Sequence, residues 1–244
     1  MTDWQGKRYW IVGASEGLGR ALAHQLSKVG VELILSARSE DRLQSLADEL
    51  PGKATVVPVD VTDRAAVETA SALIGKIDGM IYLAGVYWPM KSTEWDNEKA
   101  ETMAEVNYIG ASRTVGAVIG DMVARDKGHI VLTSSLTAFR GLPGSIGYTA
   151  SKAAILSLAE CMHADLRKTG VLVQVVNPGF IRTRLTDKND FHMPAMMEPE
   201  EAARAIFEHM NTDTFKSSFP TLFSWVFRLS QFLPDWAYYR LFGR

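Results

Sequence analysis

The sequence lacks the features that mark secreted, membrane-spanning and nucleic-acid-binding proteins. It contains one cysteine, Cys161, so no disulfide can form within the chain and a reducing compartment is expected. Met1 to Lys7 lacks the apolar core of a signal peptide, and no run reaches the roughly eighteen apolar residues of a spanning helix. The net charge of −2 excludes a general attraction to nucleic acid. We therefore expect a cytoplasmic protein.

Metal binding and thiol chemistry are also unexpected. His, Cys, Asp and Glu nowhere recur at the spacing of metal ligands, so no metal site is predicted. His192 is interpreted as a loop histidine. Cys161 lies in a strongly helical stretch and is expected to be a small buried hydrophobe instead of a reactive thiol.

Short apolar runs alternate with helical patterns along the chain. Strands are predicted at Tyr9–Val12, Val31–Ser36, Thr55–Val59, Met80–Leu83, His129–Thr133 and Leu172–Val176. Helices are predicted at Gly17–Val29, Glu40–Leu50, Arg64–Ile74, Lys99–Arg125 and Ser151–Arg167. This alternation predicts an α/β fold with a doubly wound parallel sheet and helices on both of its faces. We predict one domain, residues 1–214, extended by a helical segment at residues 215–244.

A glycine-rich turn follows the first predicted strand. Gly13, Gly17 and Gly19 have the spacing G-x-x-x-G-x-G, and a helix is predicted to begin among them. Such glycines allow a tight turn and the close approach of a pyrophosphate to a helix N-terminus. The turn could also be a plain strand-to-helix connection, but its place in the alternation favours a dinucleotide site.

The ends of the second and third strands bear on the choice of cofactor. Arg38 stands where an acidic residue would favour the ribose of NAD, and arginine suits a 2′-phosphate, so NADP(H) is favoured over NAD(H). Arg38 could instead be a solvated residue at a helix start, and Glu16 would add an unfavourable negative charge nearby. Asp60 could reach the adenine amino group or cap the helix that follows it.

Tyr148, Lys152 and Ser135 form the pattern most indicative of chemistry. Lys152 follows Tyr148 by four residues, so one turn of helix places both side chains on the same face. A nearby cation favours the phenolate, and lowering the tyrosine pKa by about three units takes roughly 4 kcal/mol, which Lys152 and any cationic cofactor would supply together. Tyr148 could then exchange a proton near neutral pH. Ser135, thirteen residues before Tyr148, could bind a carbonyl oxygen.

Together these residues resemble those of the short-chain dehydrogenase/reductase family, and the resemblance extends roughly from Lys7 to Arg184. Asn107, Ser135, Tyr148 and Lys152 match the catalytic tetrad of the family in order and spacing. The resemblance implies a Rossmann-like fold and hydride transfer between a nicotinamide cofactor and a carbinol or carbonyl carbon. It implies cofactor contacts at Gly13, Ser15, Gly17, Leu18, Gly19, Arg38, Asp60, Val61, Ala84, Gly85, Tyr148, Lys152, Pro178, Gly179, Ile181 and Thr183.

The resemblance also implies a role for each member of the tetrad. Tyr148 would be the general acid or base, and Lys152 would lower its pKa and hold the nicotinamide ribose. Ser135 would hydrogen-bond the substrate oxygen. Asn107 would hold a water that links Lys152 to solvent.

Two departures from the family pattern lie in the predicted cofactor wall. Val12 stands where the family usually has threonine, and Tyr82 and Leu83 stand where it has two asparagines. Those asparagines mainly brace the central sheet, so altered local packing is expected. The four residues of the tetrad are all present, so we do not expect a loss of activity.

The segment from Arg184 to Pro199 is expected to fold over the substrate, as the equivalent segment does in the family. It contains Phe191 and three methionines without clear periodicity. Methionines adapt to irregular apolar shapes, so a small hydrophobic alcohol or carbonyl substrate is predicted. Gap-filling in the core would explain the same methionines.

The last thirty residues are unusually aromatic. They hold ten of the 23 aromatic residues, and their charge is +3. Apolar residues recur at helical spacing, and Pro234 predicts a break between two short helices. Residues 215–244 could cover the substrate pocket, pack on a second subunit, or lie as peripheral helices in a membrane interface.

The function best supported by the sequence is that of an NADP(H)-dependent oxidoreductase acting on a hydrophobic alcohol, ketone or aldehyde. A non-catalytic nucleotide-binding protein and a membrane-associated scaffold are the alternatives, and the intact tetrad argues against the first. By resemblance, helices Lys99–Arg125 and Ser151–Arg167 would form a subunit interface, so a homodimer or homotetramer is expected.

Overall fold

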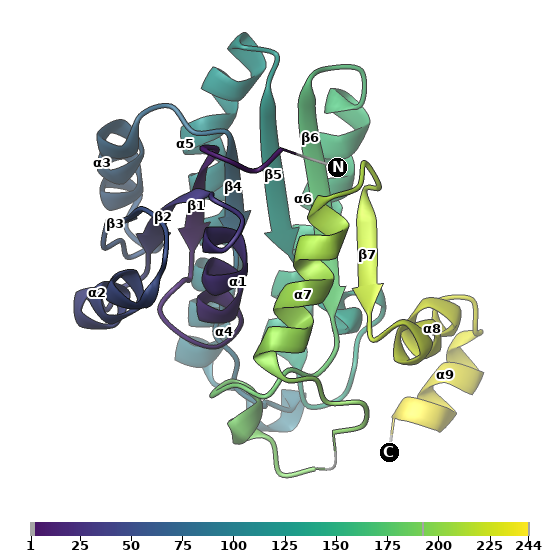
Figure 1. The fold of residues 1–244 in the computed structure, drawn as a ribbon. Helices are drawn as coiled ribbons and strands as arrows, with labels where there is room; N and C mark the ends of the chain where they lie inside the picture. The colour runs from purple at the N-terminus through teal and green to yellow at the C-terminus, as the bar shows by residue number, and fades with distance from the viewer. Residues whose placement is uncertain (1–2, 192, 244) are drawn as a thin grey trace.

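A parallel sheet of seven strands forms the centre of the computed structural model, which describes residues 3–191 and 193–243. His192, interpreted above as a loop residue, lies outside the described residues. The strands are β1 (Arg8–Val12), β2 (Glu32–Ser36), β3 (Ala54–Val56), β4 (Gly79–Tyr82), β5 (Gly128–Thr133), β6 (Val171–Pro178) and β7 (Lys216–Phe219). Their order is β3-β2-β1-β4-β5-β6-β7, and every neighbouring pair is parallel. The prediction of a doubly wound parallel sheet is confirmed, and the strand order reverses between β1 and β4 (Figure 1).

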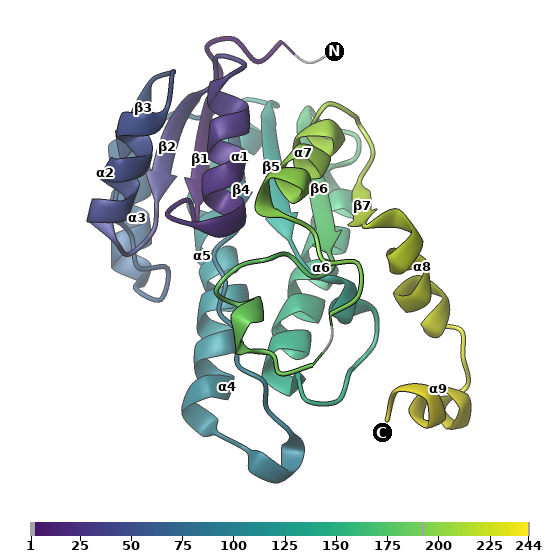
Figure 2. The same cartoon turned by 60° about the horizontal axis from the view of Figure 1, so that its bottom comes forward.

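Helices cover both faces of this sheet. They are α1 (Gly17–Ser27), α2 (Glu40–Glu49), α3 (Arg64–Ile74), α4 (Asn97–Met103), α5 (Gly110–Ala124), α6 (Ile146–Leu166), α7 (Pro199–Met210), α8 (Thr221–Ser230) and α9 (Asp235–Phe242). A π-helix, η2 (Ala104–Ile109), joins α4 to α5, and short 3₁₀ turns lie at η1 (Ser92–Glu94), η3 (Leu136–Phe139) and η4 (Thr186–Lys188). Helices α1 and α7 lie on one face, and α5 and α6 lie on the other (Figures 1 and 2).

The apolar character of the strands is explained by two cores, one on each face of the sheet. Successive residues of a strand point to opposite faces. Trp10 and Val12 of β1 therefore pack in the core beneath α3, α5 and α6, and Tyr9 and Ile11 pack in the core beneath α1, α2 and α7. The five inner strands β2, β1, β4, β5 and β6 are buried on both sides, which fixes their register and holds the carboxyl ends of β1, β4 and β5 at one edge.

The sequence-based prediction misses or misplaces several elements. The predicted helix Lys99–Arg125 is divided by the π-helix, and α6 begins at Ile146, so Tyr148 lies in its first turn. Helix α7 was not predicted. Strand β7 was also missed, because its sequence Lys-Ser-Ser-Phe lacks an apolar run and lies in a segment read as helical.

Cys161 is exposed on α6, so the expectation that it is buried is wrong. The buried residues Ile155 and Ala159 mark the inner side of this helix. Cys161 follows Ala159 by two residues, which is about 200° around a helix of 3.6 residues per turn. Within the described part of the chain, no helix is both long and apolar enough to cross a membrane.

The C-terminal helices α8 and α9 extend from the end of β7 at the edge of the sheet (Figures 1 and 2). They are separated by residues 231–234, and α9 begins directly after Pro234, as predicted. Helix α8 contacts η3, a turn that follows β5. The tail is therefore attached next to the carboxyl ends of the strands.

Candidate active site

The turn between β1 and α1 depends on two of its glycines. Gly13 has a φ of +97°, and a Cβ there would collide with the backbone of Ala84 after β4. A Cβ on Gly19 would collide with the carbonyl oxygen of Gly13. Only glycine allows this close packing of turn, helix and neighbouring strand. As a result, the N-terminus of α1 faces the edge of the sheet with its free N–H groups directed outward.

A cavity of about 650 Å³ lies over this turn, at the carboxyl ends of the strands. All sixteen residues predicted to contact the cofactor line it, from Gly13 at the end of β1 to Thr183 after β6. Its far wall includes Thr133, whose buried hydroxyl has no hydrogen-bond partner among the described residues. A long cavity that runs from a glycine turn to a polar far end fits a dinucleotide.

Asp60 lies in this cavity wall and does not cap the following helix. Its carboxylate accepts hydrogen bonds from the backbone N–H and the hydroxyl of Thr62, at 2.9 and 2.8 Å. The cap of α3 is Asp63, whose side chain accepts from Ala66 N. Of the two sequence-based interpretations of Asp60, the helix cap is wrong, and the adenine contact stays a prediction.

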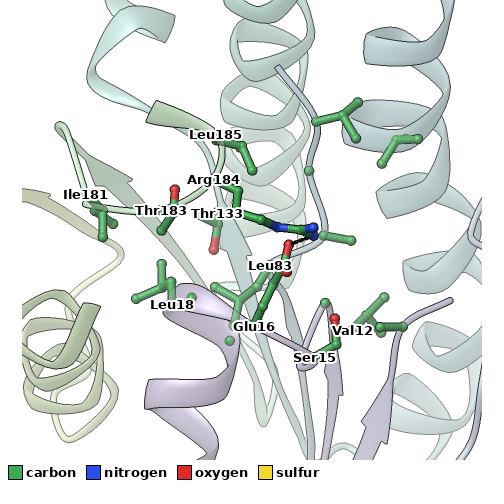
Figure 3. A pocket seen from close by; sticks show the side chains of 18 of the residues that line it. Val12, Ser15, Glu16, Leu18, Leu83, Thr133, Ile181, Thr183, Arg184 and Leu185 are labelled. Atoms are coloured by element: carbon green, nitrogen blue, oxygen red, sulfur yellow. Dashed lines mark hydrogen bonds and ion pairs between the residues drawn. The ribbon is translucent and has the colours of Figure 1, made fainter. Parts of the chain in front are cut away.

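Glu16 bridges two sides of the cavity. Its carboxylate pairs with Arg42 of α2 at 2.9 Å and, through its other oxygen, with Arg184 from the segment after β6. Figure 3 shows Glu16 and Arg184 reaching toward each other across the opening. Arg38 is exposed at the same rim. The expected unfavourable charge of Glu16 is thus offset by two arginines that the sequence analysis did not identify.

Tyr148 and Lys152 lie together on the first turns of α6. Lys152 is 4% exposed, its Nζ lies 5.7 Å from the centre of the Tyr148 ring, and it donates a hydrogen bond to the carbonyl oxygen of Thr133 at 2.8 Å. The hydroxyl of Ser134 donates to the carbonyl oxygen of Lys152 at 2.8 Å, which ties α6 to the end of β5. The predicted i, i+4 pair is therefore formed and anchored to the sheet.

Burial determines the protonation of this pair in the protein without cofactor. Burial raises the pKa of Tyr148 to about 12, although a hydrogen bond with Ser135 lowers it and the nearby Tyr87 raises it further. Burial also lowers the pKa of Lys152 to about 8. The physical reason is desolvation, which disfavours phenolate and ammonium alike. The expectation that Lys152 and a cationic cofactor together bring the tyrosine pKa near neutrality stays a prediction, because this value belongs to the protein without cofactor.

Ser135 is buried at the end of β5, facing Tyr148. It caps η3, and its hydroxyl oxygen accepts hydrogen bonds from the backbone N–H of Thr137 at 3.2 Å and from the Thr137 hydroxyl at 3.1 Å. Because both of these groups donate to it, the Ser135 hydroxyl keeps its own proton to donate. Ser135 therefore both ends the strand and presents a donor beside the phenol.

Asn107 lies in the π-helix and is fully buried. Its Nδ2 donates to the Val86 carbonyl at 3.0 Å and to the Ser151 hydroxyl at 2.9 Å, and its Oδ1 accepts from Val86 N at 2.8 Å. The side chain thus joins the loop after β4 to α6, one residue from Lys152. Its predicted role in holding a water is untested by this geometry, since both Nδ2 hydrogens are already used.

Tyr82, one of the departures from the family pattern, braces the same π-helix. Its hydroxyl donates to the carbonyl oxygen of Val106 at 2.6 Å, next to Asn107. A π-helix shifts the backbone hydrogen bonds by one residue, and such bulges often occur at functional sites. This contact between β4 and η2 is the altered packing expected at Tyr82. Leu83, the second departure at this place, lines the cofactor cavity.

A second cavity of about 540 Å³ adjoins the first, and Tyr148 lines both. Its walls include Met90, Leu136, Phe180 and Phe191. Six of residues 185–191 in the segment after Arg184, Phe191 among them, line this cavity, and the expectation that the segment folds over the substrate stays a prediction. Met197 packs into the core beside Ile181. None of the three methionines of the segment lines this cavity.

Tyr87 was not identified from the sequence. Its ring meets that of Tyr148 edge to face, with the ring centres 5.1 Å apart. Its hydroxyl donates to Asn189 at 2.8 Å, and Lys188 donates to its carbonyl oxygen at 2.7 Å. Tyr87 therefore links the segment over the cavity to the side chain predicted to exchange the proton.

Within the described residues, no group of three or more His, Cys, Asp or Glu side chains is placed to hold a metal ion. The buried histidine His129 lies away from both cavities in a polar chain. Tyr9 lies 2.8 Å from its Nδ1 and Gln174 Oε1 lies 2.9 Å from its Nε2. The amide nitrogen of Gln174 donates to three backbone carbonyls, so its oxygen accepts from His129.

Comparison with known proteins places this geometry in context. A model of the short chain dehydrogenase family matches residues 7–193. An uncharacterized oxidoreductase of Myxococcus xanthus is 36% identical in an alignment of 242 positions that covers 96% of each chain. A short-chain dehydrogenase of Sphingobium yanoikuyae in complex with NADPH is 27% identical, with a TM-score of 0.82 over 88% of each chain. A short chain dehydrogenase/reductase of Burkholderia phymatum in complex with NAD shares the fold, with a TM-score of 0.87 over 94% of each chain and 24% identity.

Proposed function

Since the chain belongs to the short-chain dehydrogenase/reductase family of oxidoreductases, we propose that it interconverts a hydrophobic alcohol and the corresponding ketone or aldehyde with NADP(H). The observation that carries this proposal is the position of Tyr148. It lies where a dinucleotide-sized cavity meets a second cavity with an apolar wall. A group at this junction can act on a substrate oxygen while the cofactor lies in the neighbouring cavity.

In the proposed reaction the nicotinamide cofactor supplies or accepts the hydride and, when oxidised, brings a positive charge to the site. Tyr148 gives a proton to the substrate oxygen in reduction or takes it in oxidation. With a pKa of about 12 in the protein without cofactor, the phenol is protonated at neutral pH and ready to donate. Ser135 donates a hydrogen bond to the same oxygen, where negative charge develops.

The two remaining members of the tetrad support Tyr148 in this proposal. Lys152 holds the nicotinamide ribose, and its ammonium group favours the phenolate form of Tyr148 when the proton leaves. Asn107 fixes the distance between the loop after β4 and α6 and is proposed to take part in proton replacement from solvent. Its contacts with Val86 and Ser151 support the first of these roles.

We propose NADP(H) over NAD(H) on the charges at the adenine end of the cavity. Arg38 is exposed at the rim before α2, and Arg42, which lines the same cavity, lies in the first turn of α2. A 2′-phosphate is dianionic near neutral pH and is recognised by arginine. Glu16 opposes this preference less than its sequence position suggests, because Arg42 and Arg184 both pair with it.

For assembly and location, we propose a homodimer or homotetramer in the cytoplasm. The support is the single cysteine, Cys161, and the resemblance to a family in which the counterparts of α4, α5 and α6 form subunit contacts. We also propose residues 1–214 as the catalytic domain and residues 215–244 as its helical extension. Sedimentation velocity measures the assembly directly.

The proposed function is tested by Tyr148→Phe. This change removes the hydroxyl and retains the ring that packs on Tyr87. We expect NADPH consumption with a series of hydrophobic ketones to fall at least about a hundredfold, the lower range of general acid catalysis, while calorimetric affinity for NADPH changes little. The matched control is Tyr239→Phe, on an exposed tyrosine of α9. Substantial turnover by Tyr148→Phe would remove the tyrosine from the proposed role.

A further inference from the structure

Helix α8 exposes an apolar stripe. Leu222, Trp225, Val226 and Leu229 recur at the i, i+3, i+4, i+7 spacing of one helical stripe, and all are exposed. The side that packs on the protein includes Phe227 and two serines whose hydroxyls donate to carbonyls of their own helix. A soluble helix ordinarily exposes a polar side. The second, exposed apolar stripe of α8 indicates that something covers it.

Exposed apolar residues continue along the chain beyond α8. Phe232, in the turn that follows, is 84% exposed, and Trp236 at the start of α9 is 74% exposed. The tail face is defined here as Leu222, Trp225, Val226, Leu229, Phe232 and Trp236. Large exposed apolar patches on soluble proteins mark interaction surfaces.

The tail face is held in place by the body of the protein. The guanidinium of Arg140, after η3, donates to the carbonyl oxygens of Ser230 and Leu233, each at 2.7 Å, and pairs with Asp235 at 2.5 Å. It also lies 4.0 Å from the centre of the Tyr238 ring. These contacts fix α8 and the start of α9, so the tail face is a built surface of the folded chain.

The charges beside the tail face distinguish its possible partners. Arg228 and Arg240 are exposed on α8 and α9, and the Arg228 guanidinium lies 4.3 Å from the centre of the Trp225 ring. Asp235 is the only acidic residue in residues 215–243, and Arg140 already pairs with it. A two-fold contact between copies would bring the arginines together without acidic partners. An anionic lipid surface would complement them.

We propose that the tail face is an interfacial membrane-binding surface, which lies in the headgroup region of an anionic bilayer with its tryptophans and leucines toward the acyl chains. Tryptophan and arginine are the side chains that favour this depth, with rings at the headgroup level and guanidinium groups at the phosphates. Each arginine near an anionic surface strengthens binding by about fivefold.

Helix α8, which carries the proposed surface on its outer side, has its inner side next to the second cavity. Phe223 of α8 lies against Phe180, with ring centres 6.1 Å apart, and Phe180 lines that cavity together with Phe191. An apolar ketone or alcohol dissolved in the bilayer would therefore meet the protein near its substrate cavity. This last step rests on the proposed function, whereas membrane binding does not.

The test is co-sedimentation of the full chain, without cofactor or substrate, with vesicles of phosphatidylcholine alone and of equimolar phosphatidylcholine and phosphatidylglycerol. Because no turnover is measured, a failure here is distinct from a failure of the proposed function. We expect binding to the mixed vesicles, and a fall of about tenfold or more in the partition coefficient for Trp225→Ser with Leu229→Ser. The matched control is Trp95→Ser with Leu73→Ser, an exposed pair elsewhere on the protein. Unchanged thermal unfolding confirms that each variant is folded.

Two further measurements decide between membrane and subunit contact. Arg228→Gln should lower binding to the mixed vesicles by about fivefold and leave binding to phosphatidylcholine unchanged. Sedimentation velocity should give the same assembly for the wild type and the Trp225→Ser, Leu229→Ser variant. The proposal is overturned if wild type and this variant bind vesicles equally, if neither binds, or if the variant forms a smaller assembly, which would make the tail face a subunit interface.

Discussion

Replacing Lys152 by methionine should stabilise the protein without cofactor while it abolishes turnover. The ammonium group of Lys152 is buried, and burial lowers its pKa from 10.5 to about 8. Each pKa unit corresponds to about 1.4 kcal/mol. The shift therefore means that keeping the charge inside the folded protein costs roughly 3 kcal/mol. Methionine has a similar length and no charge. Leaving the carbonyl oxygen of Thr133 without its partner costs about 1 kcal/mol, so a net gain of about 2 kcal/mol is expected.

The pH dependence identifies the origin of this gain. The folded-state pKa of Lys152 is depressed, so below about pH 8 the lysine is charged in both the folded and unfolded states and its cost is complete. Between about pH 8 and 10.5 the folded protein loses this proton, and the cost falls by about 1.4 kcal/mol per pH unit. The advantage of the Lys152→Met variant should therefore shrink as the pH rises through this range.

Urea unfolding of wild type and variant from about pH 7 to about pH 10 measures both quantities. The control is Lys168→Met, on an exposed lysine after the same helix, which should leave stability nearly unchanged. A Lys152→Met protein that is less stable than wild type at neutral pH would refute the argument. So would a stability difference that is constant over this range.

Three further predictions concern the cofactor cavity and the buried histidine. Arg38→Ala should weaken the affinity for NADPH, measured by calorimetric titration, by about tenfold or more, because a charged hydrogen bond to the 2′-phosphate is lost. The affinity for NADH should hardly change. Equal losses for both cofactors would contradict the proposed contact between Arg38 and the 2′-phosphate. Glu16→Gln removes the charge that pairs with Arg42 and Arg184. It should strengthen NADPH binding by about fivefold, because the repulsion between Glu16 and the pyrophosphate is lost. Weaker binding in the same titration would show that these two ion pairs hold the cavity in shape. Burial lowers the pKa of His129 to about 4, so its stabilising contribution is complete above pH 6.5 and is lost between about pH 6.5 and 4, by roughly 3 kcal/mol in urea unfolding. His129→Gln should flatten this part of the profile, and an equally steep profile in that variant would place the titration elsewhere.

The main features of the fold could be predicted from the sequence because local pattern and tertiary burial agree in them. Strands such as β1 and β5 are continuous apolar runs, as expected of strands covered on both faces. Strand β7 escaped prediction because half-buried serines carry no period-two signal. The π-helix at Asn107 escaped because nothing local distinguishes it from the α-helix on either side; its shape is held by contacts with β4 and α6.

The candidate site divides in the same way. The glycine turn and the Tyr148–Lys152 pair depend on short spacings, so the sequence placed them together. The partners of Glu16 could not be predicted from a short spacing, because Arg184 is 168 residues away from it in the chain. The raised pKa of Tyr148 in the protein without cofactor could not be predicted, because sequence spacing reveals the neighbouring cation and does not reveal desolvation.

The contact between Tyr82 and the π-helix constrains how the sequence can change in evolution. A Cβ on Gly110, the first residue of α5, would lie 2.5 Å from the Tyr82 hydroxyl oxygen and 2.7 Å from Val61. A side chain at position 110 is therefore incompatible with tyrosine at position 82 unless the backbone moves. Relatives that retain this tyrosine should retain the glycine, whereas in those with asparagine at position 82 only the contact with Val61 still restricts position 110. Positions 82 and 110 should therefore covary across the family. Their covariation would identify the members in which a tyrosine at position 82 contacts the π-helix.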